Sequence, residues 1–495
     1  MGGLEPLGEA CGVFGAFDFE GKEVFPHLYW GLISQNHRGH HSYGFAEVRG
    51  KEFAAHRSLG LIPPMRHPVI RRLFRSFKSH VGMGHVRYAT SGRSTRYWLL
   101  RDMQPFLVGW EEKIAVAFNG NLVNVKELRA ELKKKTCRLS SSSDIELLSK
   151  KLLQGMKNSD LFSAVEACMR DIEGAFSVVG MTQRGELFAF RDPLGIKPLC
   201  YGCSPDNQTF AVSSESVGLD INEFKYEAEV QPGELIIWSG EGTRRERIVK
   251  GERRAFCSFE FAYFARPDSI LCNGRPVYKI REEFGRNLAR EDPDLAKKVD
   301  VIVSIPSTGD DAAYGMHEVT GIPWERAVRR HRYVVDRAFI SSTEEREKII
   351  SRKINVTEAL KGKRIAVVED SIVRGDTSKR VIRKLRMAGV KEIHMYFTFP
   401  RIISPCFYGI DMATFGELIG STHREEEIAQ LIGADSVHYQ SLEGFVRATG
   451  VRREDLCLAC LTGEYPTPLA QKIADEMRKR FERGEVERGR VYEVE

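Results

Sequence analysis

Two adjacent carboxylates, Glu369 and Asp370, follow a short apolar run, and a turn rich in glycine and hydroxyl groups follows them. The apolar run, residues 365–368, is typical of a buried parallel strand. Ligands of open α/β sheets bind at the carboxyl ends of strands, where two carboxylates suit vicinal ribose hydroxyls. Backbone N–H groups of the turn, and of a helix expected from about Lys379, suit a phosphate. The pattern predicts a ribose 5-phosphate site, with an acidic surface loop as the alternative.

A cysteine near the front of the chain, Cys11, also has a type and position that could do chemistry. A thiol on an N-terminal residue has its own α-amino group, with a pKa of about 7.7–8.0, as a built-in base. This chemistry requires that residues 1–10 are removed as a propeptide. The alternative is a buried structural cysteine at the start of a strand.

The chain has ten cysteines among 495 residues, which is too few for a disulfide scaffold. Cys457 and Cys460 form a Cys-x-x-Cys pair that fits a redox pair or a zinc site. Thiolate-only ligation suits zinc or an iron–sulfur cluster, and unliganded thiols are a third alternative. We expect five of the cysteines to be packing residues: Cys137, Cys168, Cys200, Cys203 and Cys272.

The elements that must position these groups fall into two regions. Residues 11–240 show short strands interleaved with a few helices, which predicts an α+β region with antiparallel sheets. We expect strands over 113–118, 176–182 and 187–191, and helices over 125–132 and 144–153, with Asn124 capping the first. The charged stretch 239–254 is interpreted as a linker.

From residue 300 the pattern changes to strand–helix alternation. Strands are expected over 301–305, 364–368 and 392–398, which predicts a doubly wound parallel sheet. The charged tail, residues 471–495, predicts a helix. The first of these strands leads into the turn Pro306-Ser307-Thr308-Gly309.

Composition excludes several classes of protein. The net charge of +6 comes from 74 basic and 68 acidic side chains, which gives no basis for nucleic-acid binding. No apolar run approaches the ~18 residues of a membrane span, so no membrane partner is expected. The first residues lack the pattern of a signal peptide, and a cytoplasmic location is expected.

The string that begins with the acidic pair resembles the phosphoribosyl-diphosphate (PRPP) motif of type I phosphoribosyltransferases, and in its longer form the amidophosphoribosyltransferase family. This resemblance implies a PRPP site that contains Glu369, Asp370, Ser371, Arg374, Gly375, Thr377 and Ser378. The turn at Ser307 is similar to the family's pyrophosphate loop, and Mg²⁺ is implied beside Ser307, Glu369 and Asp370. Asp376 departs from the family, which usually has Thr there.

The front half resembles class II, N-terminal-nucleophile glutamine amidotransferases through an ordered set of short motifs. These are His37-Arg38-Gly39, Gly84-His85-Val86-Arg87-Tyr88, Gln104-Pro105, Phe118-Asn119-Gly120-Asn121, Ser141-Ser142-Ser143-Asp144 and the string from Phe190 to Leu199.

The resemblance implies roles in glutamine hydrolysis for Cys11 and for several residues of this set. The resemblance implies that Cys11 is the nucleophile and that the Gly39 carbonyl positions its amine. Arg87 would bind the α-carboxylate of glutamine and Asp144 its α-ammonium. Asn119 and Gly120 would form the oxyanion hole. His40, His41 and Phe118 depart from the usual pattern.

The remaining cysteines also match a pattern. The flanks of Cys406 and of the Cys-x-x-Cys pair resemble the iron–sulfur subgroup of the amidophosphoribosyltransferases. The resemblance implies a four-iron four-sulfur cluster on Cys257, Cys406, Cys457 and Cys460. A basic segment, Arg330-His331-Arg332-Tyr333 with Arg352 and Lys353, is similar to the family's mobile loop over PRPP, with a solvated basic loop as the alternative.

The resemblance spans residues 11 to about 470. It implies an αββα sandwich with amidotransferase activity over 11–240, followed by an α/β doubly wound phosphoribosyltransferase domain over 241–470. The implied reaction makes 5-phosphoribosylamine, glutamate and pyrophosphate from PRPP, glutamine and water, the first step of de novo purine synthesis. Purine nucleotide inhibitors and a homodimer or homotetramer are implied. A diverged amidotransferase with another acceptor, or a non-catalytic PRPP or nucleotide sensor, are the alternatives.

Overall fold

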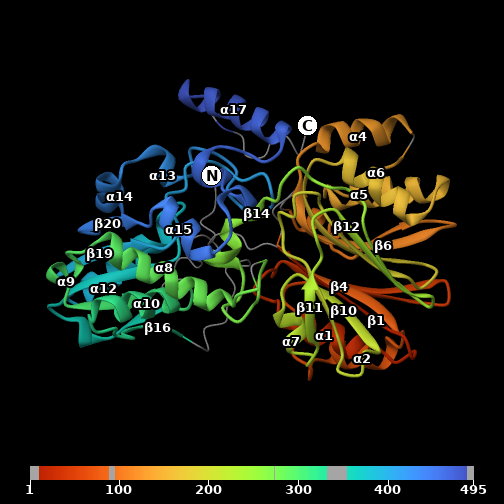
Figure 1. Cartoon of the computed structure of the whole chain (residues 1–495), viewed down its shortest axis with the longest axis horizontal. Helices are drawn as coiled ribbons and strands as arrows, with labels where there is room; N and C mark the ends of the chain where they lie inside the picture. The colour runs from red at the N-terminus through yellow and green to blue at the C-terminus, as the bar shows by residue number, and fades with distance from the viewer. Residues whose placement is uncertain are drawn as a thin grey trace.

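The computed structural model of this chain describes residues 11–88, 95–135, 137–272, 274–331, 354–485 and 487. The expected propeptide, most of the expected basic loop and the end of the tail lie outside the described residues. The two regions expected from the sequence form two halves that lie side by side (Figure 1). No described helix has the length and apolar character needed to cross a membrane.

The first half is built on two antiparallel sheets. Within the described residues, one sheet has seven strands in the order β11 (Lys225–Glu229), β9 (Cys200–Cys203), β10 (Thr209–Ser213), β1 (Gly12–Asp18), β4 (Val81–Arg87), β2 (Ser42–Arg49) and β3 (Glu52–Leu59). The described part of the other sheet has six, in the order β13 (Gly242–Arg247), β12 (Glu234–Ser239), β8 (Leu187–Arg191), β7 (Gly174–Thr182), β6 (Lys113–Leu122) and β5 (Phe106–Gly109).

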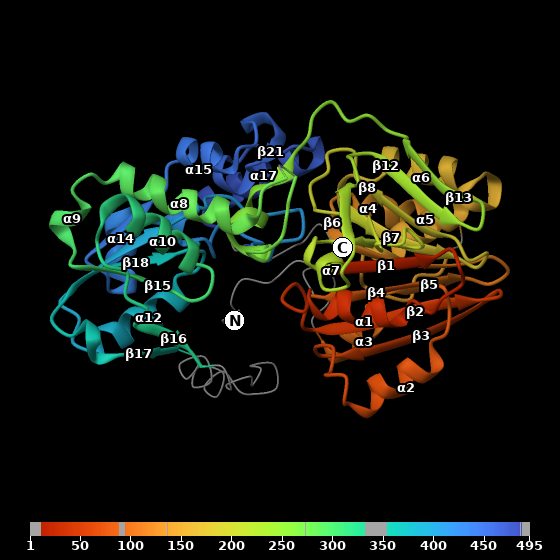
Figure 2. The same ribbon diagram turned by 60° about the horizontal axis from the view of Figure 1, so that its bottom comes forward.

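Three apolar cores make this half a four-layer sandwich. The inner faces of the two sheets share a core that includes Val13, Met83, Val179 and Trp238. Helices α1 (Phe25–Ile33), α2 (Pro68–Ser76) and α7 (Val217–Asp220) cover the outer face of the seven-stranded sheet. Helices α4 (Val125–Lys134), α5 (Ile145–Asn158) and α6 (Leu161–Asp171) cover the six-stranded sheet, and α3 (Arg96–Arg101) precedes β5. The expected αββα fold is confirmed (Figure 2).

Two local expectations differ from the structure. Residues 242–247, which charge assigns to a linker, form β13 and pair with β12, because an edge strand can expose charged side chains to water. Asn124 stands at the N-cap of α4, but its side chain bonds instead to the Asp171 carbonyl and the Glu173 N–H, at 2.8 and 3.0 Å.

The second half contains a parallel sheet in the order β15 (Val301–Ser304), β18 (Arg364–Glu369), β19 (Glu392–Phe397) and β20 (Ser436–Tyr439). One face packs on α8 (Val277–Glu291), α9 (Leu295–Lys298) and α10 (Asp310–Thr320). The other packs on α12 (Asp376–Met387) and α14 (Glu425–Ile432), with α13 (Ile419–Thr422) beside them. Strand β16 (Val328–Arg330) pairs antiparallel with β17 (Ile354–Val356). The expected doubly wound fold is confirmed.

A further apolar core lies between the two halves. The short strands β14 (Phe256–Cys257) and β21 (Leu456–Cys457) pair in parallel there. Around them an apolar core gathers a π-helical turn (Glu260–Phe264), α15 (Leu442–Thr449), α16 (Ala459–Thr462) and α17 (Pro468–Glu482). Helix α17 begins before the expected residue 471, and it buries Ala470 and Ala474.

Candidate functional site

The expected nucleophile, Cys11, is buried immediately before β1. Its thiol donates to the carbonyl oxygen of Tyr88 at 3.5 Å. Burial raises the pKa of the Cys11 thiol, while the positive charges of Arg87 and Arg38 act in the opposite direction. The negative charge of Asp144 also raises the pKa of the Cys11 thiol. The structure therefore brings Cys11, Arg87 and Asp144 together.

The two residues expected to bind glutamine come from different elements. Arg87 ends β4, and its Nη2 lies 3.8 Å from Oδ2 of Asp102. Asp144 caps α5 and accepts the Leu122 N–H at 3.0 Å. Asp102 also accepts the Ser142 hydroxyl at 2.6 Å, and so ties the Ser-rich segment before Asp144 to Arg87. Sequence reasoning missed Asp102, because nothing in its immediate neighbours marks a lone Asp as a support.

The expected oxyanion hole lies on β6. The Asn119 side chain is buried, and neither its nitrogen nor its oxygen has a hydrogen-bond partner among the described residues. A buried, unpaired amide costs about 1–3 kcal/mol and is uncommon without a functional reason. Gly120 has φ +152°, and a Cβ there would lie 1.9 Å from the Ala175 carbonyl oxygen, so this position requires glycine. The unpaired Asn119 amide is therefore available to a ligand, as an oxyanion hole requires.

The segment around Gly39 lies against the end of β4. A Cβ on Gly39 would lie 2.5 Å from the Arg87 backbone nitrogen, so only glycine permits this approach. The neighbouring His40 and His41 rings pack against Tyr88. Burial, with the nearby charges of His40 and Arg87, lowers the pKa of His41 to about 3, so that ring is neutral at physiological pH.

The unusual Phe118 has a structural role. Its side chain is in the core between the six-stranded sheet and its helices. Its carbonyl lies 3.2 Å from Nε2 of His85, and its N–H donates to Gln104 at 2.9 Å. The departure from the family therefore fills the core and leaves the backbone of the oxyanion strand anchored.

A buried charge network lies directly beneath Cys11. Arg38 donates through Nε to the Cys11 carbonyl at 3.0 Å. Its guanidinium also binds two carboxylates, Glu215 at 2.5 Å and Glu260 at 2.8 Å, and all these side chains are fully buried. Glu215 in turn accepts the Ser269 hydroxyl at 2.6 Å. The network joins the sandwich to the segment that follows β14.

The acidic pair of the second half stands at the carboxyl end of β18, as expected, and both carboxylates are buried. Glu369 accepts the Ser378 hydroxyl at 2.9 Å, and Asp370 accepts those of Ser371, at 2.7 Å, and Thr308. Burial, followed by the charge of Asp370, raises the pKa of Glu369 to about 8. Burial also raises the pKa of Asp370.

The two turns that flank this pair are those that the sequence indicates. The turn from Pro306 to Gly309 connects β15 to α10. Its Thr308 hydroxyl donates to Asp370, whereas the sequence indicates the neighbouring Ser307. Helix α12 begins at Asp376, three residues before the expected start, because Gly375 adopts φ +85° and ends the turn. The first turn of α12 therefore contains Thr377, which is exposed, and Ser378, which is buried.

Arg374 points to a carboxylate of its own half. Its Nε donates to Glu417 at 2.9 Å, and its Nη2 lies 3.7 Å from Asp411. Arg374, Asp376 and Lys379 line a cavity of about 230 Å³ beside the first turn of α12. The expected PRPP residues thus surround one end of the parallel sheet, with Arg374 at the edge.

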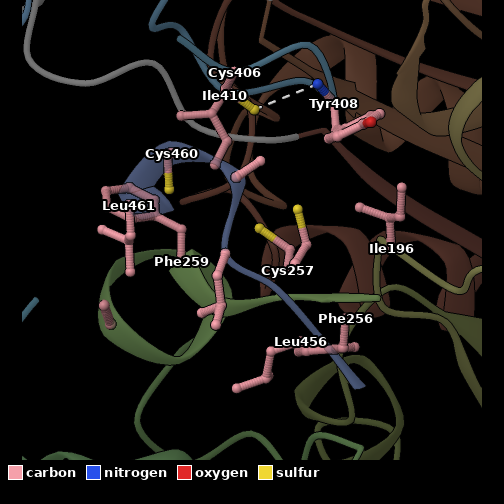
Figure 3. Packing of buried hydrophobic residues seen from close by; sticks show 14 of the residues in the cluster. Ile196, Phe256, Cys257, Phe259, Cys406, Tyr408, Ile410, Leu456, Cys460 and Leu461 are labelled. Atoms are coloured by element: carbon pink, nitrogen blue, oxygen red, sulfur yellow. Dashed lines mark hydrogen bonds between the residues drawn. The ribbon is translucent and has the colours of Figure 1, made fainter. Parts of the chain in front are cut away.

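The four expected cluster cysteines share one core. Cys257, Cys406, Cys457 and Cys460 are all buried in the apolar cluster between the two halves. The parallel pair of β14 and β21 sets Cys257 directly opposite Cys457. Figure 3 shows the sulfurs of Cys257, Cys406 and Cys460 around the same part of this apolar core. The Tyr408 N–H donates to the Cys406 sulfur at 3.3 Å.

The loop that contains Cys406 also contacts the oxyanion strand. Asn121 donates through Nδ2 to the Phe407 carbonyl at 3.2 Å. A Cβ on Gly409, which has φ +98°, would lie 3.2 Å from the Gly120 carbonyl. The cysteine core is therefore in direct contact with the expected glutamine site.

Comparison with known proteins identifies the family. A glutamine amidotransferase domain model matches residues 96–220. The chain is 40% identical to an amidophosphoribosyltransferase of Methanocaldococcus jannaschii over 476 residues, which are 92% of this chain and 98% of that protein. The chain belongs to the amidophosphoribosyltransferase family. An amidophosphoribosyltransferase of Bacillus subtilis is 37% identical over 478 residues, 94% of this chain and 96% of that protein.

A solved amidophosphoribosyltransferase structure has the same fold. Glutamine PRPP amidotransferase from Bacillus subtilis, complexed with ADP and GMP, matches with a TM-score of 0.81 at 36% identity, over 93% of this chain and 98% of that one. The expectation of a transferase with glutamine amidotransferase and phosphoribosyltransferase halves is confirmed.

Proposed function

We propose that this enzyme makes 5-phosphoribosylamine, glutamate and pyrophosphate from PRPP, glutamine and water, the first step of de novo purine synthesis. The observation that supports this most strongly is a family match that runs through both halves of the chain. The match covers 98% of the Methanocaldococcus protein, so both halves of this chain have a counterpart in that amidophosphoribosyltransferase.

In the first step, glutamine is hydrolysed at Cys11. Once residues 1–10 are removed, the freed α-amine takes the thiol proton, and the thiolate attacks the side-chain carbonyl of glutamine. Arg87 binds the α-carboxylate of glutamine, and Asp144 its α-ammonium. Asn119 and the Gly120 N–H stabilise the oxyanion, a contribution of about 3–4 kcal/mol for each donor. Ammonia leaves, and water then releases glutamate from the thioester.

In the second step, ammonia attacks the anomeric carbon of PRPP as pyrophosphate leaves. Glu369 and Asp370 accept hydrogen bonds from the ribose hydroxyls, and the turn from Ser371 to Ser378 binds the 5-phosphate through its N–H groups. Two buried carboxylates beside hydroxyls are hard oxygen donors, a set that fits Mg²⁺. Bound by these carboxylates and Ser307, the ion would neutralise charge on the leaving diphosphate.

Four buried cysteines in one core fit a four-iron four-sulfur cluster. Within the described ranges, no three His, Cys, Asp or Glu side chains are grouped to hold a single metal ion. Thiolate-only ligation suits either zinc or an iron–sulfur cluster, and the flanks of Cys406 and of the Cys-x-x-Cys pair favour the cluster. Iron and acid-labile sulfide of about four each per chain, after preparation without oxygen, would support it; stoichiometric zinc would overturn it.

Regulation and assembly belong to the same proposal. The ADP and GMP in the Bacillus subtilis complex support purine nucleotides as inhibitors. A homodimer or homotetramer and a cytoplasmic location are proposed with the family function. Light scattering at several protein concentrations, with and without GMP, tests the assembly.

The activity is tested by phosphoribosylamine formation from PRPP with glutamine, and separately with ammonia. Formation with both supports the proposal. Turnover with ammonia alone would point to a failed glutaminase, and glutamine hydrolysis without phosphoribosylamine to another acceptor. PRPP binding without either reaction would favour the sensor. Intact mass of the active protein tests the nucleophile, because a full-length chain with full glutaminase activity would contradict an N-terminal Cys11.

A further inference from the structure

A lysine of the sandwich is buried beside the cysteine core. Lys197 is fully buried, and its ammonium has no hydrogen-bond partner among the described residues. Its nearest carboxylate oxygen, Oε1 of Glu260, is 3.7 Å away, and the Phe264 ring centroid is 5.4 Å away. A buried ammonium has three donors to satisfy, so it is costly without acceptors.

The neighbouring carboxylates are already engaged elsewhere. Glu260 and Glu215 both bind the Arg38 guanidinium at hydrogen-bonding distance. Glu260, the carboxylate nearest to Lys197, accepts two hydrogen bonds from the Arg38 guanidinium, at 2.9 and 2.8 Å. The N–H groups of Lys197 therefore still need an acceptor.

The backbone fixes Lys197 next to the cysteines. Its neighbour Ile196 accepts the Cys257 N–H at 3.0 Å, and Figure 3 shows Ile196 beside Cys257. The Lys197 carbonyl accepts the Ser177 hydroxyl at 2.9 Å.

We propose that Lys197 is the buried hydrogen-bond donor and counter-charge of the iron–sulfur cluster on Cys257, Cys406, Cys457 and Cys460. The inference rests on the proposed cluster and goes beyond it, because it assigns a tuning residue from the other half of the chain. A four-thiolate cluster with a net charge of about −2 supplies sulfur acceptors where the ammonium lacks them. Lys197 would therefore act on the cluster through its charge and its hydrogen bonds to sulfur.

The physical consequence concerns the reduction potential. A fixed positive charge and N–H···S hydrogen bonds stabilise the more negative, reduced cluster, and net charge and hydrogen bonding to sulfur set cluster potentials. Removing the charge should favour the oxidised cluster. Lys197→Arg keeps both charge and donors, whereas Lys197→Met keeps only the approximate length of the side chain.

The test is a redox titration of the anaerobically purified holoenzyme, followed by its visible absorbance and electron paramagnetic resonance. Lys197→Met should change the reduction equilibrium constant about tenfold toward the oxidised form, which is roughly 59 mV lower for one electron. Lys197→Arg should restore most of the shift. Lys113→Met is the matched control, because Lys113 pairs with Glu52 at the surface, at 3.3 Å, and should leave the potential unchanged.

Iron and sulfide analysis of each variant separates the two proposals. A parent protein without iron and sulfide would refute the cluster itself. A parent with the cluster, and a Lys197→Met variant with equal iron and an equilibrium constant within twofold of the parent, would overturn the role of Lys197 alone. If Lys197→Met folds but loses the cluster while Lys197→Arg retains it, the counter-charge role is supported.

Discussion

Two pairs of buried carboxylates in this molecule lie in different electrostatic environments. Glu215 and Glu260 bind the Arg38 guanidinium, whereas Glu369 and Asp370 lie next to each other at the end of β18. Burial alone would raise the pKa of Glu215, but the charges of His37 and Arg38 and their hydrogen bonds hold it well below its usual range. At the carboxyl end of β18, burial raises the pKa of Glu369 to about 8, because the hydrogen bonds around it come from neutral hydroxyls and its neighbour is Asp370.

The difference distinguishes a structural charge from a binding charge. The pair around Arg38 is compensated within the protein, so it can stabilise the contact between the halves without any ligand. Among the described residues the pair on β18 has no ion-pair partner, and the charge of Arg281 only partly offsets the burial of Asp370. A cation bound from outside would therefore stabilise the ionised form of the pair. This is the behaviour expected of a site for a magnesium–diphosphate substrate.

The largest expected effect is at the uncompensated pair. Asp370→Asn should reduce phosphoribosylamine formation by about 10³-fold or more, because it removes a charge that the substrate complex requires. Glutaminase activity should be retained, since Cys11 lies in the other half. Parallel assays of the two activities on one preparation check this. Equal loss of both, with an unchanged circular dichroism spectrum, would contradict the separation of the sites.

A smaller effect is expected at the compensated pair. Glu215→Gln should lower the free energy of unfolding by about 3 kcal/mol at pH 7, because it leaves the buried Arg38 undercompensated. Chemical denaturation measures this change. Glu166→Gln is the matched control: Glu166 pairs with Arg170 at an exposed helix surface, where such pairs contribute about 0.3–0.5 kcal/mol.

The pH dependence of Glu215 has a definite sign. Because its folded pKa is lowered, its contribution is present above the usual Glu pKa of about 4.3 and is lost as the pH falls further. Glu215→Gln should therefore flatten the acid limb of the stability curve. An unchanged acid limb would show that another group dominates it.

Glu369 should show the opposite sign. Because its folded pKa is raised to about 8, the unliganded protein should lose stability as the pH rises from about 4.3 to 8. Binding of magnesium and PRPP should displace the proton, so affinity should rise by up to tenfold per pH unit below pH 8 and then level off. Calorimetry in buffers of different ionisation enthalpy would measure the released proton. No proton release at pH 7 would contradict an uncompensated pair.

The smallest effect is expected at Asp376, in the first turn of α12. Asp376→Thr should improve PRPP affinity by less than about tenfold, under ~1.4 kcal/mol. A carboxylate ~4 Å from a phosphate would cost roughly 4 kcal/mol at an effective dielectric of 20, so a small gain would mean that this side chain points away from the phosphate. A gain of several hundredfold in calorimetry would contradict that orientation.

The local sequence was sufficient to predict the candidate site where a single segment contains its residues. The strand, the acidic pair and the following turn are contiguous from residue 364 to 378, and β18 and α12 appear where hydrophobic pattern and glycine predict them, with the helix starting earlier. Strand β8 has the bounds expected from its pattern. Ordered motifs likewise located Cys11, Arg87 and Asp144, which the structure brings together.

Contacts between residues far apart in the chain could not be predicted from the sequence pattern. Arg38 contacts Glu260 across 222 positions of sequence, and no periodicity relates such distant charges. The only signal was a glutamate inside the apolar run from Phe259 to Ala262, which marks a buried charge in need of a partner. Lys197 gave a similar signal within a string of apolar residues and glycine.

The pairing of β14 with β21 has a consequence for the order in which the chain matures. Cys257 lies opposite Cys457, so this contact closes only after the ribosome has made nearly all of the chain. The sandwich, by contrast, is complete once β13 has emerged. We expect nascent chains to form the two sheets of the sandwich while the cysteine core is still open, so that core assembles near the end of synthesis.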